Sequence, residues 1–229
     1  MAGPGDRDEE RTANVFGTDQ EAFWAGQFGD AYTARNRGPQ ALASNLALFA
    51  RMLPRSSGIG SVLEVGANVG LNLQAIQLLL PGAELCAVEI NEQAVAELRK
   101  LPRVQVHHAS VLEFVPARQF DMVLVKGLLI HIDPTHLSRV YDLMYQASGR
   151  FICLVEYYNP TPVSVPYRGH ADRLFKRDFA GELLERFSDL RLVDYGFAYH
   201  RDPVFPQDDL NWFVLERRPI PMDGCNTRP

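Results

Sequence analysis

The feature that most constrains the fold is the stretch of residues 61–72, where an apolar run passes through small residues into a helical pattern. The run ends at Val65, and Gly66 and Gly70 stand in the turn. About nineteen residues after Gly70, a second apolar run ends in Glu89. Glycine lets the backbone approach a ligand closely, and a carboxylate at the next strand end accepts hydrogen bonds from ribose hydroxyls. The spacing therefore predicts a nucleoside site at the edge of a parallel sheet.

The composition narrows the class of protein. The 229 residues are 46% hydrophobic, which fits a soluble domain with extensions. A net charge of −5 offers no basic field for nucleic acid or an anionic membrane. No run approaches the roughly twenty apolar residues of a membrane span, and no signal peptide is recognisable. Cys86, Cys153 and Cys225 lack motif spacing, which favours a reducing compartment without disulfides or a zinc site. We expect a cytoplasmic protein whose oligomeric state the sequence leaves open.

An alternation of strand and helix patterns follows the glycine turn. Strands are expected at 62–65, 84–89, 104–108, 120–125 and 150–156, and helices at 71–80, 92–100 and 134–148. Two last strands, 190–196 and 211–216, have no helical pattern between them and are expected to pair antiparallel. The sequence therefore predicts an α/β fold, a Rossmann-like doubly wound sheet of seven strands with a C-terminal antiparallel hairpin.

Segments outside this alternation are expected to cover the site. Residues 1–14 are polar and predicted to be disordered, 15–60 to form an N-terminal helical cap, and 217–229 a tail. Within the cap, the aromatic-rich segment 20–36 is either a flap over the ligand or a helix packed on the domain. The domain of residues 61–216 carries an insertion at 160–181, rich in aromatic and charged residues, which is either a lid or a solvated face.

The motif Glu64-x-Gly66-x-Asn68-x-Gly70, with Glu89 and the terminal hairpin, resembles that of class I S-adenosylmethionine (SAM) dependent methyltransferases. In that family glycine usually occupies the place of Asn68. The resemblance implies SAM as cofactor and a small-molecule substrate. It also implies a set of residues at the cofactor: Tyr32, Arg35, Glu64, Gly66, Asn68, Gly70, Glu89, Ile90, Ser110, Val111, Lys126 and Gly127.

The resemblance implies that these residues contact different parts of SAM. Glu89 would hold the ribose, and Glu64 would orient the loop near the methionine amine. Ser110 and Val111 stand where the adenine is gripped, although the family often has an acid in place of Ser110. Lys126 would lie with Gly127 at the methionine end, or serve as a structural ion-pair partner.

A narrower resemblance covers nearly the whole chain. Segments 23–26, 32–36, 156–162 and 167–179 are similar to pseudaminic acid biosynthesis-associated methylases and to related azetidine-2-carboxylate synthases. Two reactions are therefore implied: methyl transfer to a small polar, sugar-like or amino-acid-like substrate, or cyclisation of SAM with release of methylthioadenosine. A non-catalytic SAM-binding module is a third reading.

Candidates for the chemistry follow the fourth and fifth strands. Tyr158 and Asn159 come after the fifth strand, and with Tyr32 they are suited to surround a sulfonium and orient an amine. The alternative for this loop is a proline-stiffened turn. His131 is a candidate general base, or a core histidine between Ile130 and Ile132. The sequence shows no cysteine nucleophile, metal-ligand set or Ser-His-Asp triad.

Overall fold

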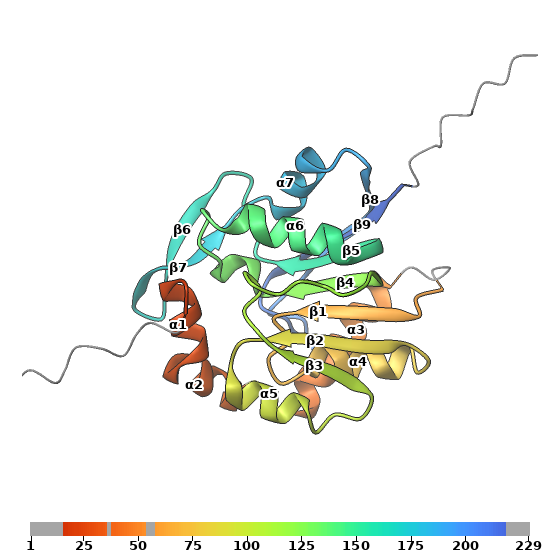
Figure 1. The fold of residues 1–229 in the computed structure, drawn as a ribbon, viewed down its shortest axis with the longest axis horizontal. Helices are drawn as coiled ribbons and strands as arrows, with labels where there is room; N and C mark the ends of the chain where they lie inside the picture. Colours follow the sequence, from red (N-terminus) through yellow and green to blue (C-terminus); the bar gives the residue numbers. More distant parts are fainter. Residues whose placement is uncertain (1–15, 36–37, 54–57, 219–229) are drawn as a thin grey trace, which may run out of the picture.

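The computed structural model describes residues 16–35, 38–53 and 58–218, which are built around one seven-stranded sheet in the order β3-β2-β1-β4-β5-β9-β8 (Figure 1). The first five strands in this order are parallel, and β9 is antiparallel to both of its neighbours. This confirms the predicted doubly wound sheet and its C-terminal hairpin. The strands are β1 (Ser61–Val65), β2 (Glu84–Glu89), β3 (Val104–His108), β4 (Phe120–Lys126), β5 (Ser148–Glu156), β8 (Leu190–Ala198) and β9 (Leu210–Arg217).

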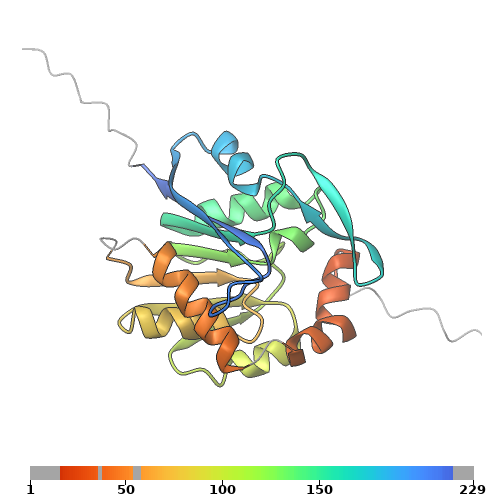
Figure 2. The same ribbon diagram turned by 180° about the vertical axis from the view of Figure 1, so that it is seen from behind.

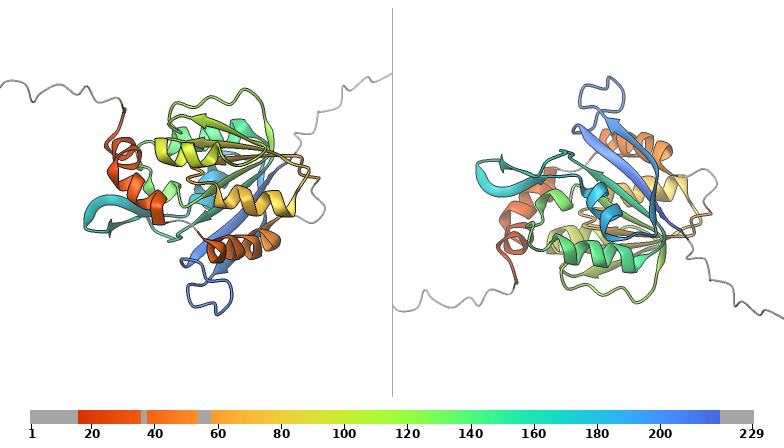
Figure 3. Two further views of the ribbon diagram at one scale, coloured as in Figure 1. Left: turned by 90° about the horizontal axis from the view of Figure 1, so that it is seen from below. Right: turned by 90° about the horizontal axis from the view of Figure 1, so that it is seen from above.

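Helices cover both faces of the sheet (Figure 3). The helices α3 (Pro39–Met52), α4 (Leu71–Leu79) and α5 (Glu92–Leu98) contribute to one apolar cluster. The helices α6 (Leu137–Ala147) and α7 (Phe179–Arg186) contribute to the other. Because both faces are covered, every residue of β1 is buried, which explains the near-continuous apolar runs of the central strands.

Two segments lie together at the carboxyl edge of the parallel strands (Figures 1 and 2). One is the helix pair α1 (Asp19–Ala25) and α2 (Gln27–Arg35); the other is the hairpin of β6 (Val163–Tyr167) and β7 (His170–Lys176). The rings of Phe23 and Phe28 stack with centroids 4.1 Å apart, and both contact the His170 ring, at 5.1 and 5.9 Å. We call these two segments together the roof.

The insertion at 160–181 therefore contains a β-hairpin and the start of α7, neither of which the sequence pattern predicts. Side-chain oxygens fix where the helices begin nearby. Asp178 accepts a hydrogen bond from the Gly181 N–H at the start of α7, at 2.8 Å. Asn91 accepts one from the Ala94 N–H at the start of α5, at 2.9 Å. The short 3-10 helix η1 (Leu129–His131) was also not predicted.

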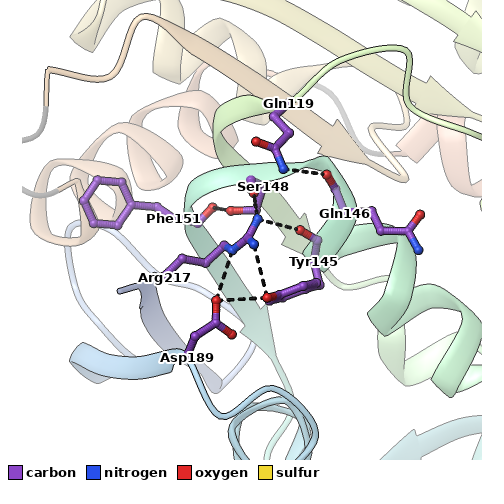
Figure 4. Close-up of polar contacts among 7 residues, drawn as sticks. All are labelled: Gln119, Tyr145, Gln146, Ser148, Phe151, Asp189 and Arg217. Atoms are coloured by element: carbon purple, nitrogen blue, oxygen red, sulfur yellow. Dashed lines mark hydrogen bonds and ion pairs between the residues drawn. The ribbon is translucent and has the colours of Figure 1, made fainter. Parts of the chain in front are cut away.

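Arg217, the last residue of β9, makes a set of polar contacts with the segments beside it (Figure 4). Its guanidinium donates to the Ser148 carbonyl at 2.6 Å and to the Tyr145 hydroxyl at 3.1 Å, and lies 4.1 Å from the Tyr145 ring centroid. The Tyr145 hydroxyl in turn donates to Asp189 at 2.9 Å. These bonds hold the C-terminal hairpin against the junction of α6 and β5.

Several sequence-based predictions fall outside the described residues: the disordered segment 1–14, Asn36 at the end of the aromatic-rich segment, and residues 219–229 of the tail with Cys225. Within the ranges that the structure describes, none of the helices has the length and apolar character needed to cross a membrane.

Gly70 offers a test of how the β1–α4 turn is built. Its φ is 77°, and a Cβ there would lie 2.6 Å from Leu101 Cδ1 and 2.7 Å from Leu98 Cδ2. Gly70→Ala should therefore lower the free energy of unfolding by about 1–3 kcal/mol in urea denaturation. Gly82→Ala, with no neighbouring atom within 4 Å of its Cβ, is the matched control. Equal stability of the two variants would contradict this view of the turn.

Candidate functional site

A cavity of about 340 Å³ lies at the carboxyl ends of β1, β2, β3 and β4, beneath α1 and α2. It is at the lower end of the roughly 300–1,000 Å³ typical of small-molecule pockets. Ten of the sequence-predicted site residues line it: Tyr32, Gly66, Asn68, Glu89, Ile90, Ser110, Val111, Lys126, Gly127 and His131. Segments far apart in the chain are thus brought to one place by the parallel strands, as the sequence predicts.

The conformation of the glycine turn depends on two residues with positive φ and on a backbone hydrogen bond. Gly66 has φ 77°, and its N–H donates to the Val88 carbonyl of the neighbouring strand at 2.9 Å. Asn68 has φ 47°, in the left-handed region that asparagine tolerates better than most residues. Its side-chain oxygen accepts from the Val69 N–H at 2.6 Å, so this oxygen serves the turn itself.

Glu89 ties the turn to the second strand. One carboxylate oxygen accepts from the Asn68 N–H at 2.7 Å, and the other accepts from the N–H groups of Ile90 and Asn91 at 2.9 and 2.8 Å. Burial raises the pKa of Glu89, while these three backbone donors act in the opposite direction. Oε1 already accepts two hydrogen bonds, whereas Oε2 accepts one and keeps acceptor capacity, so Glu89 is suited to hold a hydroxyl donor at the cavity wall.

A chain of hydrogen-bonded amides forms another part of the cavity wall. The Gln207 amide donates to Asn45 at 3.1 Å, Asn45 donates to Asn72 at 2.9 Å, and Asn72 donates to Glu64 at 2.6 Å. The chain joins the β8–β9 loop to α3, α4 and β1. Glu64 is fully buried behind Asn72 and is not a lining residue, so its influence on a ligand passes through Asn72.

Burial changes the pKa values of the ionisable groups at this wall. It raises the pKa of Glu64 to about 8, against the opposing effects of the Asn72 hydrogen bond and of Lys126. It lowers the pKa of Lys126, against the attraction of Glu64, Asp208 and Glu156. Glu156 also accepts the N–H groups of the Leu128–Leu129 backbone and thereby fixes the loop after β4. The wall thus holds ionisable groups whose charged forms are disfavoured.

His131 lies on the roof side of the cavity. Its Nδ1 is 2.6 Å from the Arg173 carbonyl, which can only accept, so Nδ1 carries the proton and Nε2 keeps a lone pair. Burial lowers the pKa of His131 to about 4, so the ring is neutral at neutral pH. The rings of Trp24 and Tyr167 lie 4.5 and 5.0 Å away, centroid to centroid.

Two hydrogen-bonded links fasten α1 and α2 to the cavity. The Asn91 amide donates to Asp30 at 2.8 Å and to the Trp24 carbonyl at 3.2 Å. Ser110 donates to the Glu21 carboxylate. The helices α1 and α2 therefore pack on the domain and also line the cavity.

Five sequence-predicted residues are not among the lining residues: Arg35, Glu64, Gly70, Tyr158 and Asn159. Arg35 is exposed at the end of α2. Tyr158 forms an isolated β-bridge with Arg177, and the Asn159 amide donates to the Thr161 carbonyl. This placement agrees with the alternative of a structured turn after β5.

Sequence reasoning did not single out several lining residues, namely Glu21, Trp24, Asn45, Asn72, Asn91, Gln207 and Asp208. Asn91 carried a signal, because it directly precedes the predicted helix 92–100 and asparagine is favoured at that position. Glu21 and Trp24 lie in the aromatic-rich segment, and Asn72 ends the glycine-turn stretch. Asn45, Gln207 and Asp208 reach the cavity through the packing of distant segments, for which the local pattern gives no signal. Among the described residues, no group of three or more His, Cys, Asp or Glu side chains is arranged to hold a metal ion.

Residues 63–147, from β1 to α6, match the family model described as "Methyltransferase domain". No curated protein matches the chain. The fold is similar to that of the DhpI complex with S-adenosylhomocysteine (SAH), at 20% identity over 88% of this chain and 94% of that one, with a TM-score of 0.57.

Two further solved structures share the fold. Magnesium protoporphyrin IX methyltransferase from Synechocystis PCC 6803, with bound SAH, is 14% identical over 87% of this chain and 100% of that one, with a TM-score of 0.63. Glycopeptide N-methyltransferase MtfA with SAM is 18% identical over 77% and 94%, with a TM-score of 0.57.

These matches show the Rossmann-like methyltransferase fold, with SAM as its cofactor. The cavity fits that cofactor, because a buried carboxylate and an open glycine turn face the same space. The sequence had predicted this fold and this cofactor.

The raised pKa of Glu64 predicts how the free energy of unfolding depends on pH. A carboxyl whose pKa rises from 4.5 to about 8 on folding stabilises the fold below pH 4.5, and this stabilisation is lost as the pH rises to 8. Glu64→Gln removes the titration, so its free energy of unfolding should fall less than that of the wild type between pH 5 and pH 8. The difference should exceed about 1.4 kcal/mol, the equivalent of one pKa unit.

Urea denaturation across this pH range measures the effect. Glu92→Gln, which changes an exposed carboxyl on α5, is the matched control and should follow the wild type. If Glu64→Gln also runs parallel to the wild type, Glu64 is charged in the folded protein and the assignment is wrong.

Proposed function

We propose that this chain transfers a methyl group from SAM to a small polar acceptor, sugar-like or amino-acid-like. The observation that supports the proposal is a cavity lined by the glycine turn, Glu89 and the residues at the ends of β3 and β4. This cavity lies beneath α1 and α2. When bound, SAM supplies an electrophilic methyl carbon with a neutral sulfide as leaving group. The protein's task is then mainly to position the acceptor, which contributes roughly 7–11 kcal/mol to lowering a barrier.

Residues at the strand ends are assigned to holding the cofactor. Glu89 accepts hydrogen bonds from the ribose hydroxyls, beside the backbone of Gly66. Ile90 and Val111 flank the adenine. The end of β4, with Lys126, takes the methionine end, next to the amides of Asn45 and Asn72.

His131 is assigned to the acceptor. Its Nε2 lone pair accepts a hydrogen bond from an acceptor hydroxyl or amine and so directs the nucleophilic lone pair. The low pKa keeps this nitrogen unprotonated at neutral pH. The acceptor's proton leaves to Nε2 or to water once the new bond to carbon forms. The rings of Trp24 and Tyr32 wall the same side of the cavity, 5.3 Å apart.

A second candidate reaction uses the same cavity: attack of the SAM amine on its own γ-carbon, giving azetidine-2-carboxylate and methylthioadenosine. The observation that favours it is the position of Lys126 in the cavity wall, where burial lowers the pKa of its ammonium group. A lysine at this place is suited to exchange a proton with the SAM ammonium. Of the residues that the sequence offered for this reaction, Tyr32 lines the cavity, whereas Tyr158 and Asn159 do not.

Product analysis separates the two reactions. The purified protein is incubated with SAM alone and with a panel of amino sugars, sugars and amino acids, and the nucleoside products are separated by chromatography. Methyl transfer predicts SAH only when an acceptor is present. Methylthioadenosine formed from SAM alone would overturn methyl transfer in favour of cyclisation. Binding of SAM without either product would leave a non-catalytic SAM-binding module.

Glu89 tests the nucleoside site itself. Glu89→Ala removes the proposed ribose hydrogen bond to its carboxylate, worth about 1.5–3 kcal/mol, and should weaken SAH binding at least ten-fold in calorimetry. Glu92→Ala, three residues along the chain and exposed, is the matched control. An unchanged SAH affinity in a folded Glu89→Ala variant would refute the assignment.

A further inference from the structure

The loop between β8 and β9, residues 199–209, brings a carboxylate to the cavity to which no role has been assigned so far. Asp208 lines the cavity beside Gln207 and is exposed to solvent. We propose that Asp208 binds an ammonium group of the methyl acceptor, so that the acceptor is an amine-bearing compound that is methylated on a hydroxyl. This inference rests on the proposed function and names the substrate class of the same site.

Asp208 differs from the other acids of the cavity in what it contacts. The lining residues that carry a carboxylate are Glu21, Glu89, Asp133 and Asp208. The first three accept hydrogen bonds from backbone N–H groups or hydroxyls of the protein. Asp208 accepts no hydrogen bond from, and forms no ion pair with, any residue that the structure describes. Both of its oxygens are therefore available to a ligand.

Hydrogen bonds to α3 hold the β8–β9 loop in place (Figure 3). The Gln40 amide donates to the Val204 carbonyl at 2.8 Å, and the Gln207 amide donates to Asn45 at 3.1 Å. Asp208 directly follows Gln207, so the loop fixes its position at the cavity before a ligand binds. A group that is positioned in advance loses less conformational freedom on binding, which favours affinity.

The charge of Asp208 acts on groups in and behind the cavity wall. Burial lowers the pKa of Lys126, and the attraction of Glu64 and Asp208 opposes this effect. Burial raises the pKa of Tyr157 to about 12, and the charge of Asp208 acts in the same direction. Because burial disfavours the ammonium form of Lys126, this lysine does not fully neutralise the carboxylate. The edge of the cavity at Asp208 therefore attracts a cation.

The chemistry of an ammonium group then determines where the methyl group goes. A carboxylate accepts charge-assisted hydrogen bonds from an ammonium group, which an N-acetylated nitrogen cannot replace because it is neutral. While it is protonated, the bound nitrogen has no lone pair and cannot attack the methyl carbon. The nucleophile is then a hydroxyl of the same acceptor, hydrogen-bonded to Nε2 of His131.

In this reaction the hydroxyl oxygen forms a bond to the methyl carbon while the carbon–sulfur bond of SAM breaks. The electron pair of that bond stays on sulfur and gives SAH, and the hydroxyl proton passes to Nε2 of His131 or to water. The acceptor class is therefore a hydroxyl-bearing amine, as in an amino sugar or a hydroxy amino acid.

The test uses two pairs of compounds in which acetylation removes the charge of the nitrogen: glucosamine with N-acetylglucosamine, and serine with N-acetylserine. Dissociation constants are measured by calorimetry on protein saturated with SAH. The wild type should bind at least one amine about ten-fold more tightly than its acetylated partner. Asp208→Asn keeps the shape of the side chain but removes its charge, so this preference should fall to about two-fold or less.

Glu185→Gln, which removes an exposed charge on α7, is the matched control and should keep the wild-type preference. Because acetylation also adds bulk, the change of preference in Asp208→Asn is the deciding quantity. An unchanged preference in Asp208→Asn would overturn the inference. Lack of a preference for either amine in the wild type would overturn it without any variant.

The ammonium group of the cofactor is the other cation that could reach Asp208, and SAH carries the same group. We expect Asp208→Asn to bind SAH as tightly as the wild type does. Loss of SAH affinity as large as the loss of amine preference would assign Asp208 to the cofactor and overturn the inference. If the wild type shows the amine preference but forms no SAH from SAM with glucosamine or serine, the proposed function fails while the ammonium site stands.

Discussion

The buried carboxylate of Glu89 is the interaction on which the rest of the site depends. It holds the glycine turn through Asn68 and fixes the start of α5 through Ile90 and Asn91. Asn91 in turn fastens the roof through Asp30. Glu89 at the end of β2 thus connects the glycine turn in the cavity wall with α1 and α2, through Asn91. Disturbance of this carboxylate is expected to reach both the turn and the roof.

Burial is the common cause of the unusual ionisation around the cavity. It raises the pKa of Glu64 and Glu156 and lowers the pKa of Lys126 and His131. The result is a site in which neutral forms are favoured on both walls. A cationic sulfonium ligand brings its own charge, so such a site relies on positioning and on hydrogen bonds more than on ion pairs.

The sequence was informative where the structure is local. The turn at Gly66, the acid at Glu89 and the alternation of strands and helices follow from periodicity and spacing, and parallel strands place their carboxyl ends together. It was uninformative where contacts span the chain, as between Glu21 and Ser110 or between Gln207 and Asn45. The β6–β7 hairpin was missed for a related reason, since short strands outside the main sheet carry little periodic signal.

The decisive measurement is a crystal structure of the protein with bound SAH. We expect SAH in the cavity, with its ribose hydroxyls on Glu89 and its homocysteine end toward Lys126. The adenine should lie between Ile90 and Val111. SAH bound elsewhere, or in the cavity with its ribose away from Glu89, would contradict the account.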